Sequence, residues 1–131
     1  RLALTAAETG HLVLATLHAA SAARAVDRII DAYTEGEKDS ARALLAEALQ
    51  GVIAQVLLPA ADGAARVAAH EVLVATPAVR NLIREGRSAQ LLSAMQAGAA
   101  QGMQTLQASL ARLVQQGRIS AATAREQGMT G

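Results

Sequence analysis

The 131-residue sequence contains no cysteine, no phenylalanine and no tryptophan, and it has a single tyrosine. Without cysteine the chain can form neither a disulfide bond nor a thiolate metal site. Without aromatic rings it lacks the stacking surfaces on which proteins bind single-stranded nucleic acid. Its net charge of +1 also provides no field that would attract nucleic acid or acidic lipid. We therefore expect no nucleic-acid partner.

Long apolar runs are missing as well. No stretch approaches the roughly 18 apolar residues that a membrane-spanning helix needs, and no signal peptide is present, so we expect a soluble, cytoplasmic protein. The chain begins at Arg1 rather than at a methionine, which favours a fragment of a longer protein. Alanine is abundant, with 33 residues, and the core must be built from Leu, Val, Ile and Ala. Closely packed helices suit such a core.

The apolar pattern predicts helices and a few strands in the first part of the chain. Helices are expected at residues 2–8, from Ser21 to Tyr33, and at 38–51. Two strands, residues 52–59 and 66–75, are expected to form an antiparallel hairpin, because an Asp-Gly turn signal lies between them.

After residue 76 every segment reads as helical. Thr76 is the expected N-cap of a helix that has Pro77 in its first turn and Gly86 beyond its end. Further helices are expected from Ser88, at 103–117 and after Ser120.

The segment HLVLATLH, residues 11–18, is a short and nearly continuous apolar run. Such a run, bounded by Gly10 and by small residues, is typical of a strand buried on both faces of a parallel sheet. A buried helix is the alternative interpretation. The choice matters because the run has a histidine at each end.

These two histidines, His11 and His18, are not expected to share a metal ion. A strand rises about 3.3 Å per residue, so seven steps separate them by about 23 Å and leave them on opposite faces. In a helix they would still be about 10 Å apart. Because ligands bind beyond the carboxyl ends of strands in open α/β sheets, His18 is the candidate ligand-binding residue. The alternative is that each histidine is a structural residue at a strand end.

His70 is followed directly by Glu71, a pair for which general acid/base chemistry is conceivable. A half-exposed strand residue is the simpler interpretation of His70. The sequence contains no Ser/His/Asp order, no paired-carboxylate spacing and no phosphate-binding P-loop. The residues alone therefore yield one candidate ligand-binding side chain and no complete catalytic site.

Three segments resemble landmarks of one known family. Residues 2–31, LALTAAETGHLVLATLHAASAARAVDRIID, resemble the His-box region of the type IV pilus retraction ATPases, the motors of twitching motility. Residues 66–86, RVAAHEVLVATPAVRNLIREG, resemble the next landmark, with the motif AVRNLIRE at Ala78–Glu85. Residues 102–120, GMQTLQASLARLVQQGRIS, resemble the C-terminal helices. The segments occur in the order of the family, and the similarity covers essentially the whole chain.

This resemblance implies a hexameric ATPase of the secretion superfamily with a RecA-like C-terminal domain. The Walker A loop, acidic box and Walker B glutamate of that family precede the His box, and none of them is in this chain. The implied fold class is α/β: the C-terminal part of a RecA-like ATPase domain, with few strands and flanking helices, followed by an all-helical tail. Residues 1–75 would be the partial ATPase core, and residues 76–131 the helical C-terminal region.

The same resemblance assigns site residues. His18 would be a catalytic and nucleotide-binding residue that reaches the γ-phosphate of ATP, to which an imidazole can donate a charge-assisted hydrogen bond. His11 would be the first histidine of the box, with a weaker catalytic or a structural role. On the AVRNLIRE helix, Val79, Leu82 and Ile83 should face the core, with Arg80 and Arg84 together on another face. The residues expected to couple the motor to its neighbours are Arg80, Asn81, Leu82, Arg84 and Glu85.

Ligands and partners follow in the same way. The intact protein would bind ATP and Mg²⁺, neither of which the fragment alone is expected to hold. It would form a homohexamer, contact the inner-membrane pilus assembly platform, and lie in the cytoplasm, peripheral to the inner membrane at the pilus base. Many extension and secretion relatives carry a tetracysteine zinc module, so the lack of cysteine favours retraction. The alternatives are a type IV pilus extension or type II secretion ATPase, or a non-catalytic coupling module.

Overall fold

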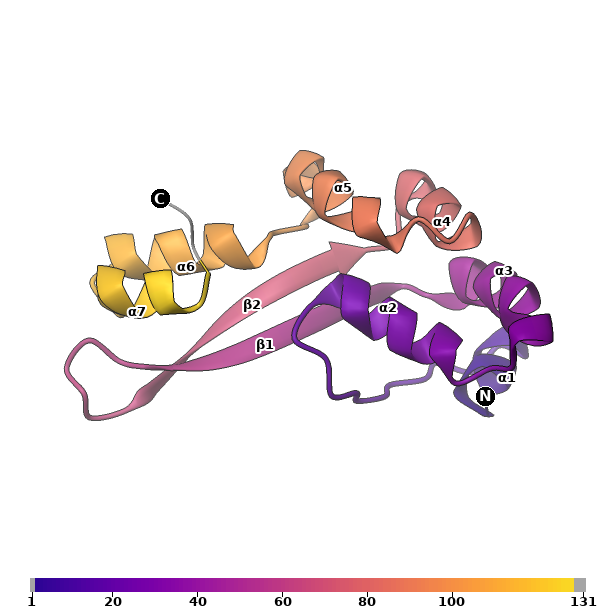
Figure 1. Cartoon of the computed structure of the whole chain (residues 1–131), viewed down its shortest axis with the longest axis horizontal. Coiled ribbons are helices and arrows are strands. Elements are labelled where there is room, and N and C mark those ends of the chain that lie inside the picture. Colours follow the sequence, from indigo (N-terminus) through magenta and orange to yellow (C-terminus); the bar gives the residue numbers. More distant parts are fainter. Residues whose placement is uncertain (1, 129–131) are drawn as a thin grey trace.

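A long antiparallel hairpin forms the centre of the computed structural model, which describes residues 2–128. Strand β1 (Gly51–Pro59) pairs with strand β2 (Arg66–Val74) along its whole length, from Gly51 opposite Val74 to Pro59 opposite Arg66 (Figure 1). In the connecting loop the Asp62 carboxylate accepts the N–H of Ala64 at 2.9 Å, and Gly63 has a φ of +74°, which glycine adopts without strain. The predicted hairpin is confirmed.

Helices precede and follow this hairpin. Within residues 2–128, three α-helices come first and four come after: α1 (Leu2–Glu8), α2 (Ala22–Asp31), α3 (Lys38–Ala48), α4 (Pro77–Arg84), α5 (Leu91–Ala97), α6 (Leu106–Gln115) and α7 (Ala121–Glu126). The predicted helices are confirmed, with changed boundaries. The helix expected at 103–117 spans Leu106–Gln115, because Gln104 is paired with Val72 of β2. Helix α3 ends at Ala48 instead of continuing to residue 51, because Leu49 is extended and Gly51 already pairs with β2.

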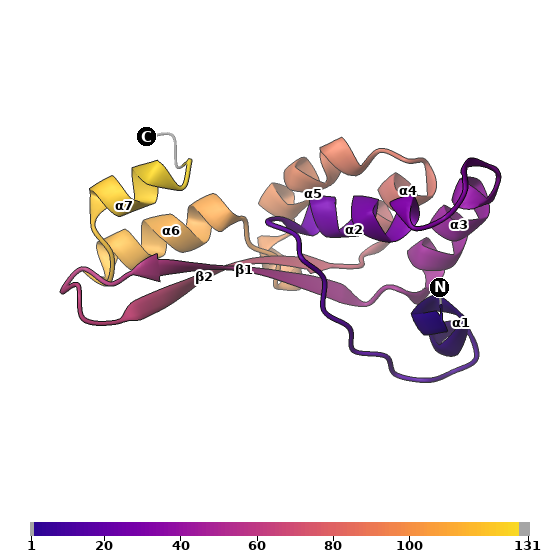
Figure 2. The same ribbon diagram turned by 60° about the horizontal axis from the view of Figure 1, so that its bottom comes forward.

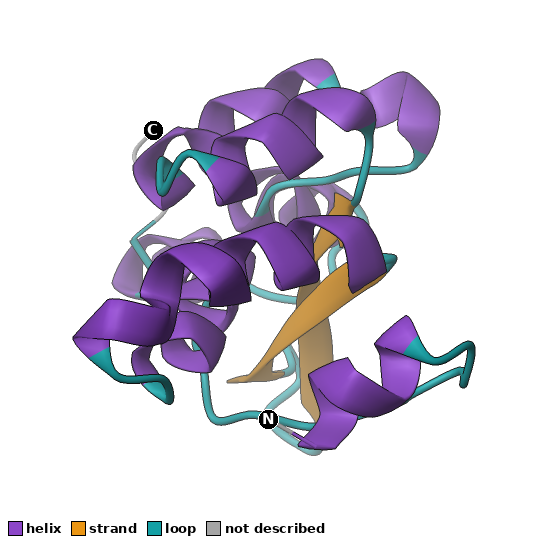
Figure 3. Cartoon of the chain, turned by 90° about the vertical axis from the view of Figure 1, so that its right-hand side faces the viewer, coloured by secondary structure: helices purple, strands orange, loops and turns teal. Residues whose placement is uncertain are grey.

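The hairpin has one covered and one open face. Along β1 the side chains of Ala54 and Leu58 are buried, whereas those of Ile53 and Leu57 are 71% and 50% exposed. Figure 2 shows α2, α5, α6 and α7 on one side of the sheet, and α1 with the loop that follows it on the other. Seen from the end that carries α3, the two strands lie beside a larger group of helices (Figure 3). The alternation of buried and exposed side chains along β1 is the period-two pattern of a sheet with one buried face.

Buried apolar side chains form two clusters, one toward each end of the hairpin. We call the first the proximal cluster; its members larger than alanine are Leu4, Val26, Ile30, Leu45, Leu73, Val79, Ile83, Leu91, Met95 and Met103. The second, the distal cluster, consists of Leu58, Val67, Ala69, Leu110, Leu113, Ile119 and Ala124. The core-facing residues predicted for α4, Val79, Leu82 and Ile83, are thereby confirmed. The division of the chain after residue 75 stays a prediction.

Residues 11–18 form neither the predicted strand nor the alternative helix. They run as an irregular segment between α1 and α2 (Figure 2), in which Leu12 is 85% and Leu14 is 90% exposed. The prediction of a buried strand is wrong for this structure. A strand that is buried on both faces needs hydrogen-bonded neighbours along its edges. In residues 2–128, however, β1 and β2 are the two strands of the sheet, and they pair with each other.

The helices of the described region are short. None of those within residues 2–128 has the length and apolar composition that would be needed to span a lipid bilayer.

Candidate functional site

His11 lies at the carboxyl end of helix α1, where it contacts the backbone. Gly10 has a φ of +96°, and the N–H of His11 returns to the Ala6 carbonyl at 3.1 Å. The ring atom Nδ1 lies 3.2 Å from the same carbonyl oxygen and 3.3 Å from the Thr9 hydroxyl. A carbonyl can only accept a hydrogen bond, so this contact requires the proton on Nδ1. His11 thus closes a helix end, as a structural histidine would.

His18 lies in a different environment. It is exposed, and no hydrogen bond joins it, or any of residues 12–20, to another described residue. The alternative of a satisfied structural histidine therefore suits His11 but not His18. The structure does not bring the two imidazoles together at a metal site, and the described residues contain no group of three or more metal-ligating side chains.

The segment that carries His18 ends at two polar contacts. Ser21 is the N-cap of α2, and its hydroxyl accepts the N–H of Arg24 at 3.1 Å. The Glu71 carboxylate on β2 accepts the N–H of Ala22 at 2.8 Å, although the two residues are 49 positions apart. Glu71 is only 6% exposed. These contacts satisfy two of the N–H groups that the first turn of a helix leaves without partners.

His70, the neighbour of Glu71, points to the other face of the sheet. Its Nε2 lies 3.0 Å from the amide oxygen of Gln55 on β1. Consecutive strand residues face opposite sides, so the Glu71 carboxylate does not lie beside this imidazole. The conceivable acid/base pair is not formed, and His70 is the half-buried strand residue that the simpler interpretation predicted.

The outer edge of β2 is closed by the chain that leads into α6. The N–H of His70 donates to the Ser109 hydroxyl at 3.1 Å, and the Gln104 side chain donates to the His70 carbonyl at 2.8 Å. Val72 and Gln104 also exchange two backbone hydrogen bonds of 2.9 and 3.1 Å. These contacts leave that part of the edge unavailable for pairing with another strand.

Arg80 on α4 is half-buried against the end of helix α3, apart from the more exposed Arg84 with which the sequence grouped it. Its Nη1 donates to the carbonyl oxygens of Ala46 and Glu47, at 2.6 and 3.0 Å. Both carbonyls belong to the last turn of α3, whose final C=O groups have no partner within the helix. A guanidinium at this position also suits the partial negative charge of a helix carboxyl end. Arg80 is therefore a contact between α3 and α4.

The other candidate coupling residues are more exposed. Arg84 donates to the Asn81 side chain at 2.8 Å and pairs with Glu47 at 3.0 Å, with 42% of its own side chain exposed. Glu85 pairs with Arg87 at 3.1 Å. Leu82 is half-buried against the proximal cluster, as predicted, and Val79 and Ile83 lie within that cluster. The exposed polar residues of the motif are thus Asn81, Arg84 and Glu85.

Sequence reasoning missed the role of Glu71 and of the residues that close the edge of β2. A signal for Glu71 was present, because it lies at every second position with Val67, Ala69 and Leu73, on the buried face of β2. A lone carboxylate in such a register must find a hydrogen-bond donor. No comparable signal marked Ser109 or Gln104, whose partners are distant in sequence.

Comparison with known proteins places the chain in a family. A family model described as Type II/IV secretion system protein matches residues 1–66, about half of the chain. The chain belongs to this family. The match includes the segment with both histidines and strand β1.

Individual relatives point to one branch of the Type II/IV secretion system family. The chain is 56% identical to a twitching motility protein of Neisseria gonorrhoeae over 95% of its length. It is 55% identical to the type IV pilus retraction ATPase PilT of Pseudomonas aeruginosa over 96% of its length. These matches cover 33% and 36% of the two relatives, so the chain spans about a third of their length.

A solved structure agrees with this assignment. A crystal structure of the pilus retraction motor PilT with bound ADP superposes with a TM-score of 0.84 and 42% sequence identity, covering 95% of this chain and 34% of that one. The resemblance to pilus retraction ATPases and the expected fold class are confirmed.

Proposed function

We propose that this chain is the C-terminal segment of an ATP-driven motor that retracts type IV pili. Similarity over 95–96% of the chain to proteins named for twitching motility and pilus retraction carries this proposal. The structural match to a retraction motor with bound ADP supports nucleotide binding by the intact protein. Retraction is favoured over extension or secretion because both of these relatives are named for it or for the motility it drives.

Within that motor, His18 is the residue we assign to the γ-phosphate of ATP. Its imidazole is exposed and has no partner among the described residues, so it is free to donate to a phosphate oxygen. When the γ-phosphate leaves, that acceptor is lost, and the segment that carries His18 can then change position. His11 contributes by fixing the start of the segment on α1.

The remaining parts of the proposal concern the whole protein. It would bind Mg²⁺ with ATP through residues outside this chain, since the described residues offer no group of metal ligands. It would assemble as a homohexamer and work in the cytoplasm, at the inner-membrane platform of the pilus. The exposed residues of α4, Asn81, Arg84 and Glu85, are the proposed contact with a neighbouring subunit or with that platform.

Substitution of His18 by alanine in the full-length motor tests the assignment. Loss of one preorganised donor to a reacting group lowers turnover by about 10²–10³-fold, whereas ATP binding, which rests on other residues, should change little. His70→Ala is the matched control, because it removes an imidazole that contacts Gln55 on the open face of the sheet. Steady-state ATPase assays and nucleotide titration give both quantities. Normal turnover of the His18→Ala motor would show that His18 has no part in hydrolysis.

Deletion of the full-length gene distinguishes retraction from extension. Cells that lose a retraction motor keep their pili but cannot withdraw them, whereas cells that lose an extension motor have none. We expect piliated cells that do not twitch, scored by electron microscopy and on agar. Non-piliated cells would assign the protein to extension instead.

A further inference from the structure

Glu71 is a charged side chain on the buried face of β2, at a position that an apolar residue usually occupies. Its neighbours on the covered face of β2 are Ala69 and Leu73, both fully buried, and Glu71 itself is only 6% exposed. Burial of a carboxylate is unfavourable unless hydrogen bonds compensate for the lost water. The proposed mechanism does not use this residue, so the presence of a carboxylate on the covered face of the sheet needs another explanation.

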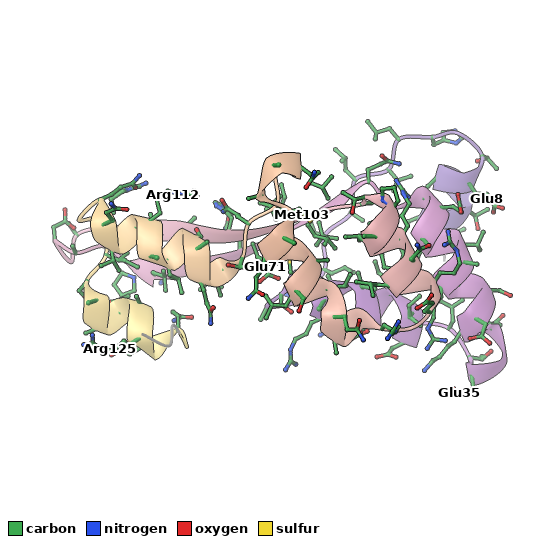
Figure 4. The ribbon with its side chains drawn as sticks, turned by 90° about the horizontal axis from the view of Figure 1, so that it is seen from above. Glu8, Glu35, Glu71, Met103, Arg112 and Arg125 are labelled. Atoms are coloured by element: carbon green, nitrogen blue, oxygen red, sulfur yellow. The ribbon has the colours of Figure 1, made fainter. Side chains whose placement is uncertain are left out.

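The contacts of Glu71 supply that reason. Its carboxylate accepts the N–H of Ala22, the first residue of α2, in a buried hydrogen bond of 2.8 Å. Such bonds to a charged acceptor are stronger than neutral ones, and a negative charge is stabilised at a helix amino end. Figure 4 shows Glu71 in the middle of the molecule, between the α6–α7 pair and the helices of the proximal end. The residue therefore ties α2 to the centre of the sheet.

This tie lies close to the proposed phosphate-contacting histidine. Residues 12–20 make no hydrogen bond with any described residue, so the segment is held at its two ends. One end is His11 on α1, and the other is the pair of contacts at Ser21 and Ala22. His18 is three residues from Ser21 and four from Ala22, but seven from His11. The second anchor therefore restricts the position of His18 more than the first does.

We propose that Glu71 is a positioning residue, which holds the first turn of α2 on β2 and thereby sets where His18 meets the phosphate. This inference rests on the proposed function. Glu71 touches no reacting atom. Its effect on hydrolysis passes through the backbone between Ala22 and His18, and it depends on the reach of the carboxylate as well as on its charge.

Two conservative substitutions in the full-length motor separate reach from charge. Glu71→Gln keeps the length of the side chain and an oxygen that can accept the Ala22 N–H, but it loses the charge. Glu71→Asp keeps the charge but is one methylene shorter, so it cannot reach that N–H from the same backbone position. Misplacement of a catalytic group by about 1 Å costs roughly 10²-fold in rate. We expect kcat to fall by one to two orders of magnitude, about 10–100-fold, in Glu71→Asp. Glu71→Gln should stay much closer to the unsubstituted motor, and KM should change little in either variant.

A double substitution tests whether the effect passes through His18. If it does, Glu71→Asp should lower kcat no further in a motor that already carries His18→Ala, because the two residues then act as one unit. Amide hydrogen exchange in the peptide that contains Ala22 should speed up in Glu71→Asp and remain slow in Glu71→Gln. A general loss of stability would speed exchange throughout the chain, so the readout is exchange at Ala22 relative to a peptide from α6.

The possible outcomes separate this inference from the function on which it rests. An unchanged kcat in Glu71→Asp, a larger loss in Glu71→Gln than in Glu71→Asp, or losses that multiply with His18→Ala would each overturn the positioning role. None of these results affects the assignment of His18. Unchanged turnover in the motor that carries His18→Ala alone would instead overturn the assigned role of His18, and the positioning role together with it.

Discussion

Replacement of Arg80 by alanine should weaken the packing of helix α3 against helix α4 and lower the free energy of unfolding. The substitution removes two hydrogen bonds, to the carbonyls of Ala46 and Glu47, and one positive charge at the end of α3. Hydrogen bonds from a charged donor contribute about 1.5–3 kcal/mol, and a cation at a helix carboxyl end contributes about 0.3–1 kcal/mol. Because Arg80 is partly exposed and water can replace some of these contacts, we expect a loss of about 2 kcal/mol in the free energy of unfolding. For a domain of this size that corresponds to a melting temperature lower by roughly 8 °C.

Arg84 provides the matched control for this experiment. It stands one helical turn further along α4 and pairs with Glu47 at 3.0 Å, with 42% of its side chain exposed. Exposed ion pairs contribute about 0.2–1 kcal/mol, so Arg84→Ala should destabilise the chain much less than Arg80→Ala. Arg80→Lys should fall between the two, since an ammonium keeps the charge but not the planar fork of donors.

Denaturant unfolding of the three variants, followed by circular dichroism, measures these differences. Equal free energies of unfolding for Arg80→Ala and Arg84→Ala would refute the assignment of Arg80 as the contact between the helices. The same result would make the two arginines equivalent residues of one face of α4, as the sequence pattern grouped them. If Arg80→Ala is instead the more destabilising variant, coupling of α4 to a partner is best tested with Arg84→Ala alone. A variant that lacks both arginines would also lose stability.

Two further predictions follow from the site. Arg84→Ala in the full-length motor should leave ATPase activity largely intact but abolish twitching, as measured by motility on agar at matched protein levels; normal twitching would make the exposed side of α4 an ordinary charged surface. The 131-residue chain alone should hydrolyse no ATP, because the P-loop that supplies consecutive N–H groups and a lysine to the phosphates is not in its sequence. Turnover above a blank, in material free of contaminating ATPases, would contradict this second expectation.

Features that depend on neighbouring residues were predicted well. Ser21, Thr76 and Ser120 cap helices as expected, since each hydroxyl accepts the N–H of the residue three positions further along the chain. The hairpin was equally clear, because its turn signal lies between two strands of matched length. Caps and turns are formed by residues close together in the sequence, so they can be predicted without knowing how distant segments pack.

Features that depend on distant residues were predicted poorly. The strand at residues 11–18 was inferred from its apolar composition, but strand formation needs a pairing partner, which composition does not supply. The contact of Arg80 with α3 rests on carbonyls 33 and 34 residues earlier in the chain. Helical periodicity placed Arg80 correctly away from Val79 and Ile83, yet it could not show that α3 lies against that side of α4.

The positions of His18 and of α4 are linked through strand β2. Glu71 ties α2 to this strand, and the strand continues into α4 after Val74, with Leu73 in the proximal cluster beside Val79 and Ile83. Close-packed cores resist gradual deformation, so the first turn of α2 cannot shift far along β2 unless the Glu71 contact breaks or the proximal cluster moves as a unit. In the second case a change at the phosphate would reach α4 directly. In the first, α4 would stay in place, so under the proposed function the strength of the Glu71 contact would decide which of the two movements occurs.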